Sequence, residues 1–149
     1  MKIHKADKKD FEGYSILRKE SLEYYKKISD EKLRFSDKQI KSEFEEVLSN
    51  PKRVLLIIEE DKNIKGFVIG TLIKNNYQCN THLDEIYVDK KFRRRGFSKL
   101  LLNEFSKWSK LKKAKIVRLG VSVNNKKAMK FYKKIGFKIK HFEMEKRLS

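Results

Sequence analysis

A basic loop with a single glycine lies between an apolar strand pattern and a helix pattern. Three arginines stand together in it, although most other basic residues of the chain are lysines. A guanidinium group matches two phosphate oxygens at once, and the free N–H groups at a helix start add donors and a favourable dipole. The pattern therefore predicts a phosphate-binding turn, made of Arg93, Arg94, Arg95, Gly96, Phe97 and Ser98.

Two adjacent carboxylates, Asp84 and Glu85, precede this loop on the same predicted strand. A carboxylate near an amine can accept its proton, directly or through water. Strand alternation sends the two side chains to opposite faces, so only one of them meets a substrate unless a bulge changes the parity. Both stay candidates for a general base, His82 on the face of Asp84 is a third, and solubilising charges at a strand edge are the alternative.

A second motif follows about 30 residues after the glycine loop and reads Asn125-x-x-Ala128-x-x-Phe131-Tyr132-x-x-x-Gly136-Phe137. Asparagine is a good helix N-cap and glycine a good C-cap, so the motif predicts a short helix between them. The two motifs, in this order and spacing, resemble those of the GCN5-related N-acetyltransferases (GNAT), and the resemblance covers nearly the whole chain. Ser98 departs from the family pattern, in which glycine or alanine holds the last place of the first motif.

The resemblance implies an α/β (α+β) fold and acetyl-CoA as cosubstrate. It implies that Tyr132 is the general acid for the departing thiolate and that a main-chain N–H near Tyr87 or Val88 binds the thioester carbonyl. Asp84 aligns with a carboxylate of polyamine and aminoglycoside acetyltransferases. The coenzyme-binding residues that the resemblance implies are Ile86, Tyr87, Val88, Arg93, Arg94, Arg95, Gly96, Phe97, Ser98, Asn125 and Tyr132.

The acceptor is expected to be a primary amine that attacks the thioester directly. A small molecule (a polyamine, an aminoglycoside or an amino-acid-like amine) is favoured over a protein N-terminus or lysine, because Gly120 stands where enzymes that acetylate ribosomal-protein N-termini carry a glutamate. A non-catalytic module that binds nucleic acid or coenzyme A remains the alternative. We expect the acceptor side to come from the first half of the chain, through Glu20, Glu23, Tyr24, Tyr25, Asp30, Glu31 and Phe35.

The composition limits these alternatives. A length of 149 residues suits one domain, 1–149, with its own core. The net charge of +18 falls mostly in the half that carries the motifs, where it would attract an anionic ligand. One cysteine and three scattered histidines predict neither a disulfide nor a metal site. The sequence has no membrane-spanning run and no signal-peptide core at its start, so we expect a cytoplasmic protein; a homodimer remains open.

Periodicity and turn signals predict the elements that position these residues. Strands are expected at 2–6, 54–58, 66–73, 83–88, 116–123 and 137–144, and helices at about 7–27, 36–50, 98–112 and 126–135. The order predicts one mixed, mostly antiparallel central sheet with helices on both faces.

Overall fold

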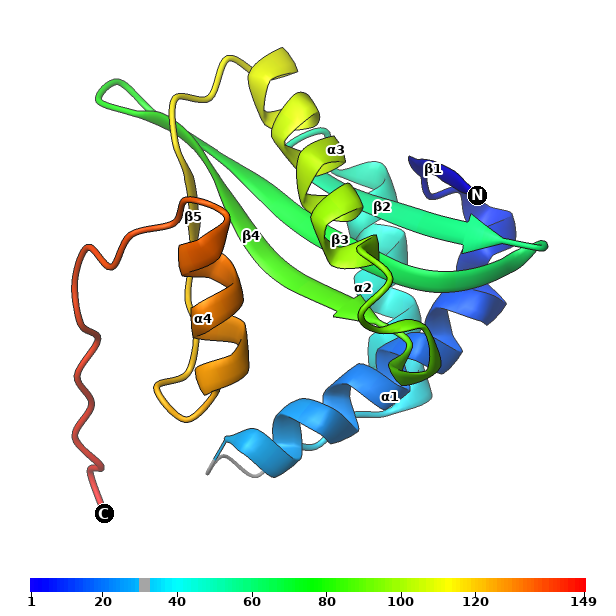
Figure 1. The fold of residues 1–149 in the computed structure, drawn as a ribbon, viewed down its shortest axis with the longest axis horizontal. Helices are drawn as coiled ribbons and strands as arrows, with labels where there is room; N and C mark the ends of the chain where they lie inside the picture. The colour runs from blue at the N-terminus through cyan, green and yellow to red at the C-terminus, as the bar shows by residue number, and fades with distance from the viewer. Residues whose placement is uncertain (30–32) are drawn as a thin grey trace.

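The computed structural model describes residues 1–29 and 33–149, in which five strands form one sheet in the order β1-β2-β3-β4-β5 (Figure 1). Asp30 and Glu31, named above for the acceptor side, lie outside the described residues. Each helix of the described chain is too short or too polar to cross a lipid bilayer. The elements are β1 (Lys2–Lys5), α1 (Phe11–Ile28), α2 (Asp37–Ser49), β2 (Arg53–Glu60), β3 (Asn63–Lys74), β4 (Cys79–Val88), α3 (Phe97–Leu111), β5 (Val117–Leu119) and α4 (Lys126–Lys134), with 3-10 turns η1 (Lys8–Asp10) and η2 (Lys90–Phe92).

Side-chain caps fix where several helices begin. Ser36 accepts a hydrogen bond from the N–H of Gln39, whose side chain accepts one from the N–H of Ser36, which is a reciprocal capping box for α2. Asp7 caps η1 in the same way, and α1 continues from this turn. Asn125 caps α4 through the N–H of Ala128. The helix starts that the sequence predicts at Ser36 and Asn125 are therefore present.

Strands β1 to β4 pair antiparallel in sequence order, and β5 is parallel to β4. The short turn at Asp61 and Lys62, both with positive φ, joins β2 and β3 as a hairpin. The predicted mixed, mostly antiparallel sheet is confirmed.

The sheet has a core on each face. Helices α1 and α2 cover one face, where Tyr14, Phe44 and Phe67 are buried together. Helix α3 covers the other face, where Leu101 and Phe105 pack on Val68. The predicted helices on both faces are thus confirmed, and β4, with Tyr87 in one core and Val88 in the other, lies between them.

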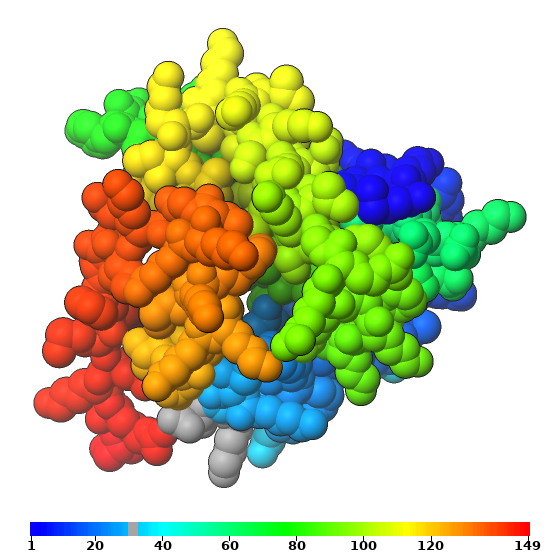
Figure 2. All heavy atoms as spheres, in the orientation of Figure 1, coloured from blue at the N-terminus to red at the C-terminus, as the bar shows by residue number. Residues whose placement is uncertain are grey.

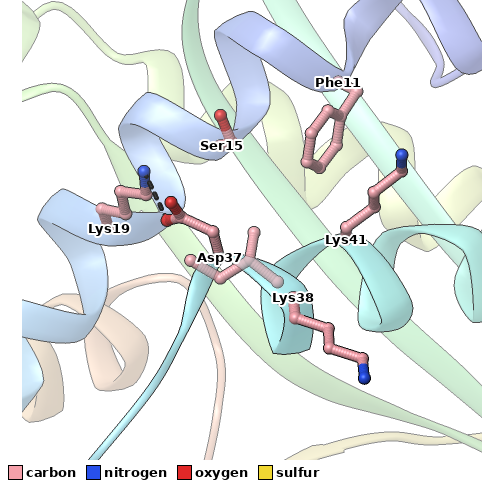
Figure 3. Close-up of a pocket in the computed structure, with 7 residues that line it drawn as sticks. Phe11, Ser15, Lys19, Asp37, Lys38 and Lys41 are labelled. Atoms are coloured by element: carbon pink, nitrogen blue, oxygen red, sulfur yellow. Dashed lines mark ion pairs between the residues drawn. The ribbon is translucent and has the colours of Figure 1, made fainter.

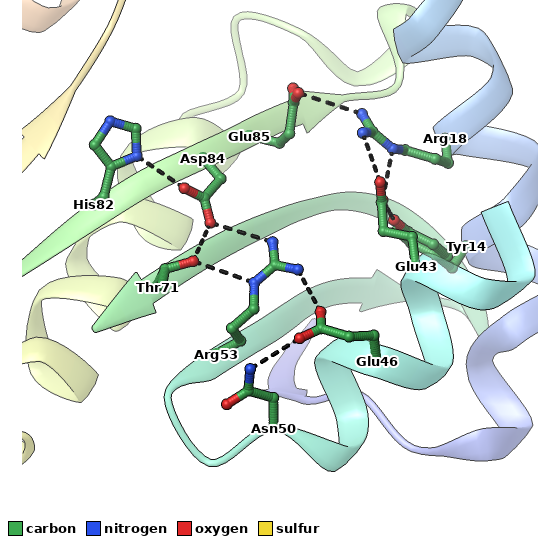
Figure 4. A network of polar contacts seen from close by, with 10 residues as sticks. All are labelled: Tyr14, Arg18, Glu43, Glu46, Asn50, Arg53, Thr71, His82, Asp84 and Glu85. Carbon is green, nitrogen blue, oxygen red and sulfur yellow. Dashed lines mark hydrogen bonds and ion pairs between the residues drawn. The ribbon is translucent and has the colours of Figure 1, made fainter. Parts of the chain in front are cut away.

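A β-bulge interrupts the pairing of β3 with β4. Ile69 faces Glu85 and Gly70 faces Leu83, so Asp84 has no partner residue on β3. Because of the bulge, the side chains of Asp84 and Glu85 point to the same face of the sheet, the one covered by α1 and α2 (Figure 4). The expectation that the two carboxylates lie on opposite faces is therefore wrong, because simple alternation does not hold across a bulge.

The predicted final strand, 137–144, is also wrong for the described chain. Residues 137–149 form no strand, and the C-terminal segment runs apart from the sheet (Figure 1). Strand β5 is likewise shorter than predicted, covering three of the eight residues expected at 116–123. Both errors fall at the β5 edge of the sheet. The sequence there alternates apolar and polar residues as a strand does, but in the structure these residues pair with no further strand of the described chain.

Gly70 lies opposite the bulge, directly under the ring of Phe105, and a Cβ at this position would overlap that ring. We expect Gly70→Ala to lower the free energy of unfolding by about 1–3 kcal/mol, because the buried ring must shift. Gly120→Ala is the matched control, since nothing lies within 4 Å of its Cβ position. Urea unfolding of both variants tests this, and equal stabilities would contradict the packing argument.

Candidate active site

The second half of β4 has an open edge. Strand β5 pairs only with Thr81–Leu83, so from Asp84 onward no strand of the described chain lies beside this edge of β4. The N–H of Asp89 donates to the carbonyl of Lys65 at 2.8 Å, which directs the backbone groups of Asp89 toward β3. By alternation, the N–H and C=O groups of Val88 and Ile86 point out of the open edge.

Two side chains already use carbonyls of this edge. The hydroxyl of Tyr25, from α1, donates to the carbonyl of Ile86 at 3.0 Å, and Nε of Arg93 donates to the carbonyl of Val88 at 3.2 Å. These contacts leave the N–H groups of Ile86 and Val88 as the donors that an incoming carbonyl oxygen could meet. The predicted main-chain donor near Tyr87 or Val88 is thereby narrowed to Val88 or Ile86, because Tyr87 directs its N–H toward β3.

The glycine loop ends in a helix start that lacks its own cap. Gly96 (φ 80°) and Arg94 (φ 64°) have left-handed backbone conformations, which turn the chain sharply into α3. No side chain caps α3, its first turn contains no acidic residue, and the first intrahelical bond is donated by Leu100 to Gly96. The N–H groups before Leu100 are therefore available to an anion, whereas α2 and α4 are capped by their own side chains.

The three arginines of the loop have different surroundings. The guanidinium of Arg93 lies over the rings of Tyr24 and Tyr87, at 5.0 and 5.2 Å from their centroids. Arg95 pairs with Glu60 at 3.4 Å, while Arg94 is exposed. The three arginines therefore do not form one uniform cationic surface, because Arg93 lies over two tyrosine rings and Arg95 pairs with Glu60.

The next two residues of the motif are at the start of α3. Phe97 is buried under the helix, so only its N–H can serve a ligand, and Ser98 is half-buried on the first turn.

Asp84 is held by three neighbours on the face of α1 and α2 (Figure 4). It accepts hydrogen bonds from Thr71 Oγ1 and from Arg53 Nη2, and Nδ1 of His82 lies 2.8 Å from its other oxygen. Arg53 also pairs with Glu46 of α2, which extends the network to the helix. Both oxygens of Asp84 are therefore engaged in the structure.

Glu85 has a different environment. Its carboxylate lies 3.6 Å from Nη1 of Arg18, a buried residue of α1 that also binds both oxygens of Glu43. Burial raises the pKa of Glu85, Arg18 opposes this shift, and the charges of Glu43 and Asp84 add to it. Glu85 is thus more basic than an ordinary surface glutamate, as a general base working near neutral pH requires.

Tyr132 lies on α4 and packs against the core under α3. Its ring packs on those of Phe131 and Phe137, at 5.5 and 5.6 Å between centroids. Burial raises the pKa of Tyr132 to about 12, and the charge of Glu85 adds to this shift. The pKa of Tyr25 is also raised, first by burial and then by the charges of Glu85 and Tyr132. Tyr132 therefore keeps its proton at neutral pH and can donate it.

A cavity of about 210 Å³ lies beside the open edge, between α1 and the end of β4. Figure 2 shows a hollow between α4 and the residues around the glycine loop, with α1 beneath it. The residues that line the cavity are Glu20, Glu23, Tyr24, Lys27, Tyr87, Lys90 and Arg93. Three of the residues predicted for the acceptor side, Glu20, Glu23 and Tyr24, thus meet Arg93 of the first motif here.

A larger hollow, of about 390 Å³, lies between α1 and α2 (Figure 3). It is lined by Phe11, Ser15, Lys19, Asp37, Lys38, Ile40 and Lys41, and an ion pair of 2.7 Å joins Lys19 to Asp37. None of these residues belongs to either motif or to the open edge of β4. We therefore place the candidate active site at the smaller cavity and the open edge.

Sequence reasoning missed Arg18 and Glu43. Their signal was weak, since each is a charged residue within an amphipathic helix pattern and reads as part of a solvated face. Arg18 follows the buried Leu17 and lies four residues after the buried Tyr14, which places it on the apolar side of α1. A charge at such a position needs a partner, and this requirement could have directed attention to the carboxylates of β4 and α2.

Solved structures of other proteins share this fold. A tetramutant of the BH1408 protein from Bacillus halodurans has the same fold, with a TM-score of 0.89 at 20% identity over 99% of this chain and 100% of that one. The aminoglycoside N-acetyltransferase AAC(6')-Iy, solved in complex with CoA, matches with a TM-score of 0.80 at 20% identity over 99% of both chains. At these identities the likeness shows a shared fold, one found among acetyltransferases.

The model of the acetyltransferase (GNAT) family matches residues 14–137, which is most of the chain. The chain therefore belongs to the GNAT acetyltransferase family, and the assignment predicted from the two motifs is confirmed. An uncharacterized N-acetyltransferase of Methanocaldococcus jannaschii is 43% identical over 58 residues, which are 39% of this chain. The chain spans about a quarter of that relative, 26% of its length.

Replacing Arg18 tests the buried ion-pair cluster. Arg18→Met leaves the carboxylates of Glu43 and Glu85 without their shared cation, so we expect the free energy of unfolding to fall by about 1–3 kcal/mol. This loss is smaller than for a fully buried ion pair, because both acids are partly exposed. Lys19→Met on the same helix removes an exposed ion pair with Asp37 and should change the free energy of unfolding by less than about 1 kcal/mol.

The same variant has a pH signature. Without Arg18 the pKa of Glu85 rises further, so the folded state binds more protons than the unfolded state between the ordinary and the raised pKa. Stability then increases as the pH falls through this window, and the deficit of Arg18→Met relative to the wild type should shrink. Urea unfolding at several pH values measures this, and a deficit independent of pH would contradict the pairing.

Proposed function

We propose that the protein is an acetyl-CoA-dependent N-acetyltransferase in which an acceptor amine attacks the thioester directly. The observation that carries this proposal is the open edge of β4, where the hydroxyl of Tyr25 donates to the carbonyl of Ile86, and burial and the charge of Glu85 raise the pKa of both Tyr25 and Tyr132. The acidic side chains of α1, α2 and β4 lie on one side of this open edge. The start of α3, which no side chain caps, lies on the other side.

The residues present fit a coenzyme of this kind. The free N–H groups at the start of α3 and the exposed Arg94 would hold the pyrophosphate, helped by the left-handed turn at Gly96. The N–H of Val88 or Ile86 would hold the carbonyl oxygen of the acetyl group. Acetyl-CoA, when bound, supplies an acetyl group already activated as a thioester. Asn125 keeps its capping bond in the structure and remains a predicted coenzyme contact.

Glu85 is the general base of this proposal. Asp84 has both oxygens engaged by neighbours, whereas the ion pair of Glu85 with Arg18 is longer, at 3.6 Å. Its raised pKa suits removal of a proton from an ammonium group, directly or through one water. Asp84, with His82 and Arg53, would then fix the bulge that directs Glu85 toward the amine.

The favoured acceptor is a small cationic amine. Glu20 and Glu23 line the cavity beside the open edge together with Lys27, Lys90 and Arg93, and Lys90 lies 4.0 Å from Glu20. A cationic amine would meet Glu23, for which the described residues show no ion pair. The structurally similar aminoglycoside acetyltransferases support this class of acceptor. A protein N-terminus or lysine is the alternative acceptor, and binding to nucleic acid is less favoured because Arg93 and Arg95 contact the fold.

Calorimetric titration tests the first step of the proposal. The protein is titrated with acetyl-CoA and separately with a short DNA duplex, each at low and moderate salt. Saturable one-site binding of acetyl-CoA at moderate salt is expected, while salt-labile binding of both ligands would support a general polyanion surface. Release of free thiol with a panel of polyamines, aminoglycosides and amino acids, and with peptides as the contrasting class, then identifies the acceptor.

The role of Glu85 predicts a pH effect. A base must be deprotonated to act, so kcat/KM should fall as the pH drops below the raised pKa of Glu85. We expect Glu85→Gln to lower kcat/KM about 100-fold and to abolish this acid limb, while Asp84→Asn lowers activity but keeps the limb. An unchanged acid limb in Glu85→Gln would reject Glu85 as the base.

The role of Tyr132 predicts a loss of turnover without a loss of coenzyme binding. Tyr132→Phe keeps the aromatic packing and removes the donated proton, so we expect kcat to fall at least about tenfold with an unchanged Kd for acetyl-CoA. Tyr77→Phe is the matched control, because Tyr77 is 96% exposed. A kcat for Tyr132→Phe equal to that of the wild type would reject the assignment.

A further inference from the structure

The stretch of residues 105–142 contains no acidic side chain. It holds 13 lysines and arginines in 38 residues, and thus contributes 13 of the net 18 positive charges of the chain. The remaining 111 residues carry 25 basic and 20 acidic side chains. A lysine-rich composition accounts for many lysines, but it does not account for acids that stop at Glu104 and resume at Glu143. The missing acids indicate a surface suited to an anionic partner.

The basic side chains of this stretch face solvent. All of them are exposed except Lys112, which is half-buried. Among the described residues, only Lys107 forms an ion pair with an acid, at 3.4 Å from Glu104 on the same helix. Figure 2 shows the yellow atoms that end α3 next to the orange atoms of α4 on one face of the molecule. Ammonium groups gathered in this way repel one another, and a bound polyanion relieves the repulsion.

The tip of the β3–β4 hairpin adds an aromatic ring. Tyr77 is 96% exposed, more than any other large apolar residue of the described chain. The turn that presents it is ordered by Asn75, whose Oδ1 accepts hydrogen bonds from the N–H groups of Tyr77 and Gln78. A ring held in water on a hydrogen-bonded turn offers both of its faces to a planar partner.

Hydrogen bonds join this tip to the basic turn between α3 and β5 (Figure 1). The N–H of Lys115 donates to the carbonyl of Cys79 at 2.9 Å, and Nη1 of Arg118 donates to Oε1 of Gln78 at 3.4 Å. Because Gln78 follows Tyr77 directly, the exposed ring and the cations of the turn belong to one surface. We call it the hairpin–turn surface, and it comprises Tyr77, Lys110, Lys113, Lys115 and Arg118.

The hairpin–turn surface is separate from the candidate coenzyme site. The uncapped N–H groups lie at the start of α3, at Phe97, whereas Lys110 and Lys113 lie at and just beyond its other end (Figure 1). A helix of 15 residues spans roughly 22 Å at 1.5 Å per residue. Arg93 and Arg95 of the glycine loop contact the fold and form no part of this surface. The coenzyme site therefore leaves these cations unexplained.

We propose that the hairpin–turn surface binds single-stranded nucleic acid, with its lysines and Arg118 on the phosphates and the ring of Tyr77 stacked on a base. A cationic track beside an exposed aromatic ring is the combination that holds single strands, because unpaired bases offer their faces for stacking. A duplex hides those faces and would use the lysines alone. RNA and DNA share this chemistry and differ at the 2′-hydroxyl.

Other anionic partners fit this surface less well. An anionic membrane is bound by a helix whose apolar side enters the lipid below a row of cations. The apolar side of α4 is not available for this, because Phe131, Tyr132 and Ile135 pack on the core under α3. An acidic peptide would satisfy the lysines but would give Tyr77 no planar group to stack on. The exposed ring therefore favours a nucleic acid.

Fluorescence anisotropy with labelled single strands of RNA and DNA, and with the matching duplexes, tests the proposal on the full chain without coenzyme. We expect at least one kind of single strand to bind more tightly than its duplex. Tyr77→Ala should weaken single-strand binding about tenfold, because base stacking is lost, while Tyr77→Phe keeps the ring and should bind like the wild type.

A pair of triple variants tests the phosphate contacts. Lys110→Gln/Lys113→Gln/Lys115→Gln should weaken binding about tenfold and lower the dependence of log affinity on log salt by about 2. The matched control, Lys8→Gln/Lys38→Gln/Lys41→Gln, removes the same charge from exposed lysines of η1 and α2 and should keep the wild-type affinity and salt dependence. Equal losses in the two triple variants would mean that net charge alone is responsible, which overturns the proposal.

Three further results would also overturn it. They are the absence of single-strand binding at low salt, an unchanged affinity in Tyr77→Ala, and tighter binding of polyglutamate or of phosphatidylglycerol vesicles than of either single strand. Circular dichroism and urea unfolding of each variant separate a lost contact from a lost fold. The affinity for acetyl-CoA should be unchanged in all of these variants. Because the binding assay contains no coenzyme and no amine, this proposal and the proposed function can fail independently.

Discussion

The separation of β5 from the second half of β4 is the constraint on which the site depends. A strand in the middle of a sheet satisfies its N–H and C=O groups on both sides, but β4 does so on one side only beyond Leu83. The N–H and C=O groups of Ile86 and Val88, which a neighbouring strand would otherwise bind, therefore stay available. Tyr25 and Arg93 already donate to the two carbonyls. The chain thus obtains a binding edge inside a sheet without disrupting either core.

The bulge at Asp84 is the second structural feature on which the site depends, and its effect is to place charged side chains close together. By giving two consecutive residues the same facing, it brings Asp84 and Glu85 together among Glu43, Glu46, Arg18 and Arg53. Burial raises the pKa of Glu85, the charges of Glu43 and Asp84 add to this shift, and Arg18 limits it. The result is one carboxylate that is fixed by neighbours and one that remains basic.

The sequence was informative where local signals and core packing agree. Caps at Ser36 and Asn125, the hairpin at Asp61, and the alternation of β2 and β3 predicted elements that the structure contains. The bulge was not predictable from parity, because the extra residue at Asp84 arises from the register of β4 against another strand, β3, where Gly70 packs under the ring of Phe105. Arg18 was missed because a helical pattern does not reveal which charged residue is buried with partners from distant elements.

The error at the final strand has a different physical origin. The apolar residues at 137–144 do have a strand-like composition, yet a strand requires a paired neighbour, and these residues pair with no strand of the described chain. Burial divides the molecule at the same place: the fully buried residues of the described chain all lie at or before Ser109, and those after it are partly buried or exposed. The proposed acid, Tyr132, and the proposed base, Glu85, are both partly buried, but they lie on opposite sides of this division of the chain. The relative position of acid and base therefore depends on the contacts that hold α4 on the sheet, which Phe131, Tyr132 and Ile135 make with the core under α3.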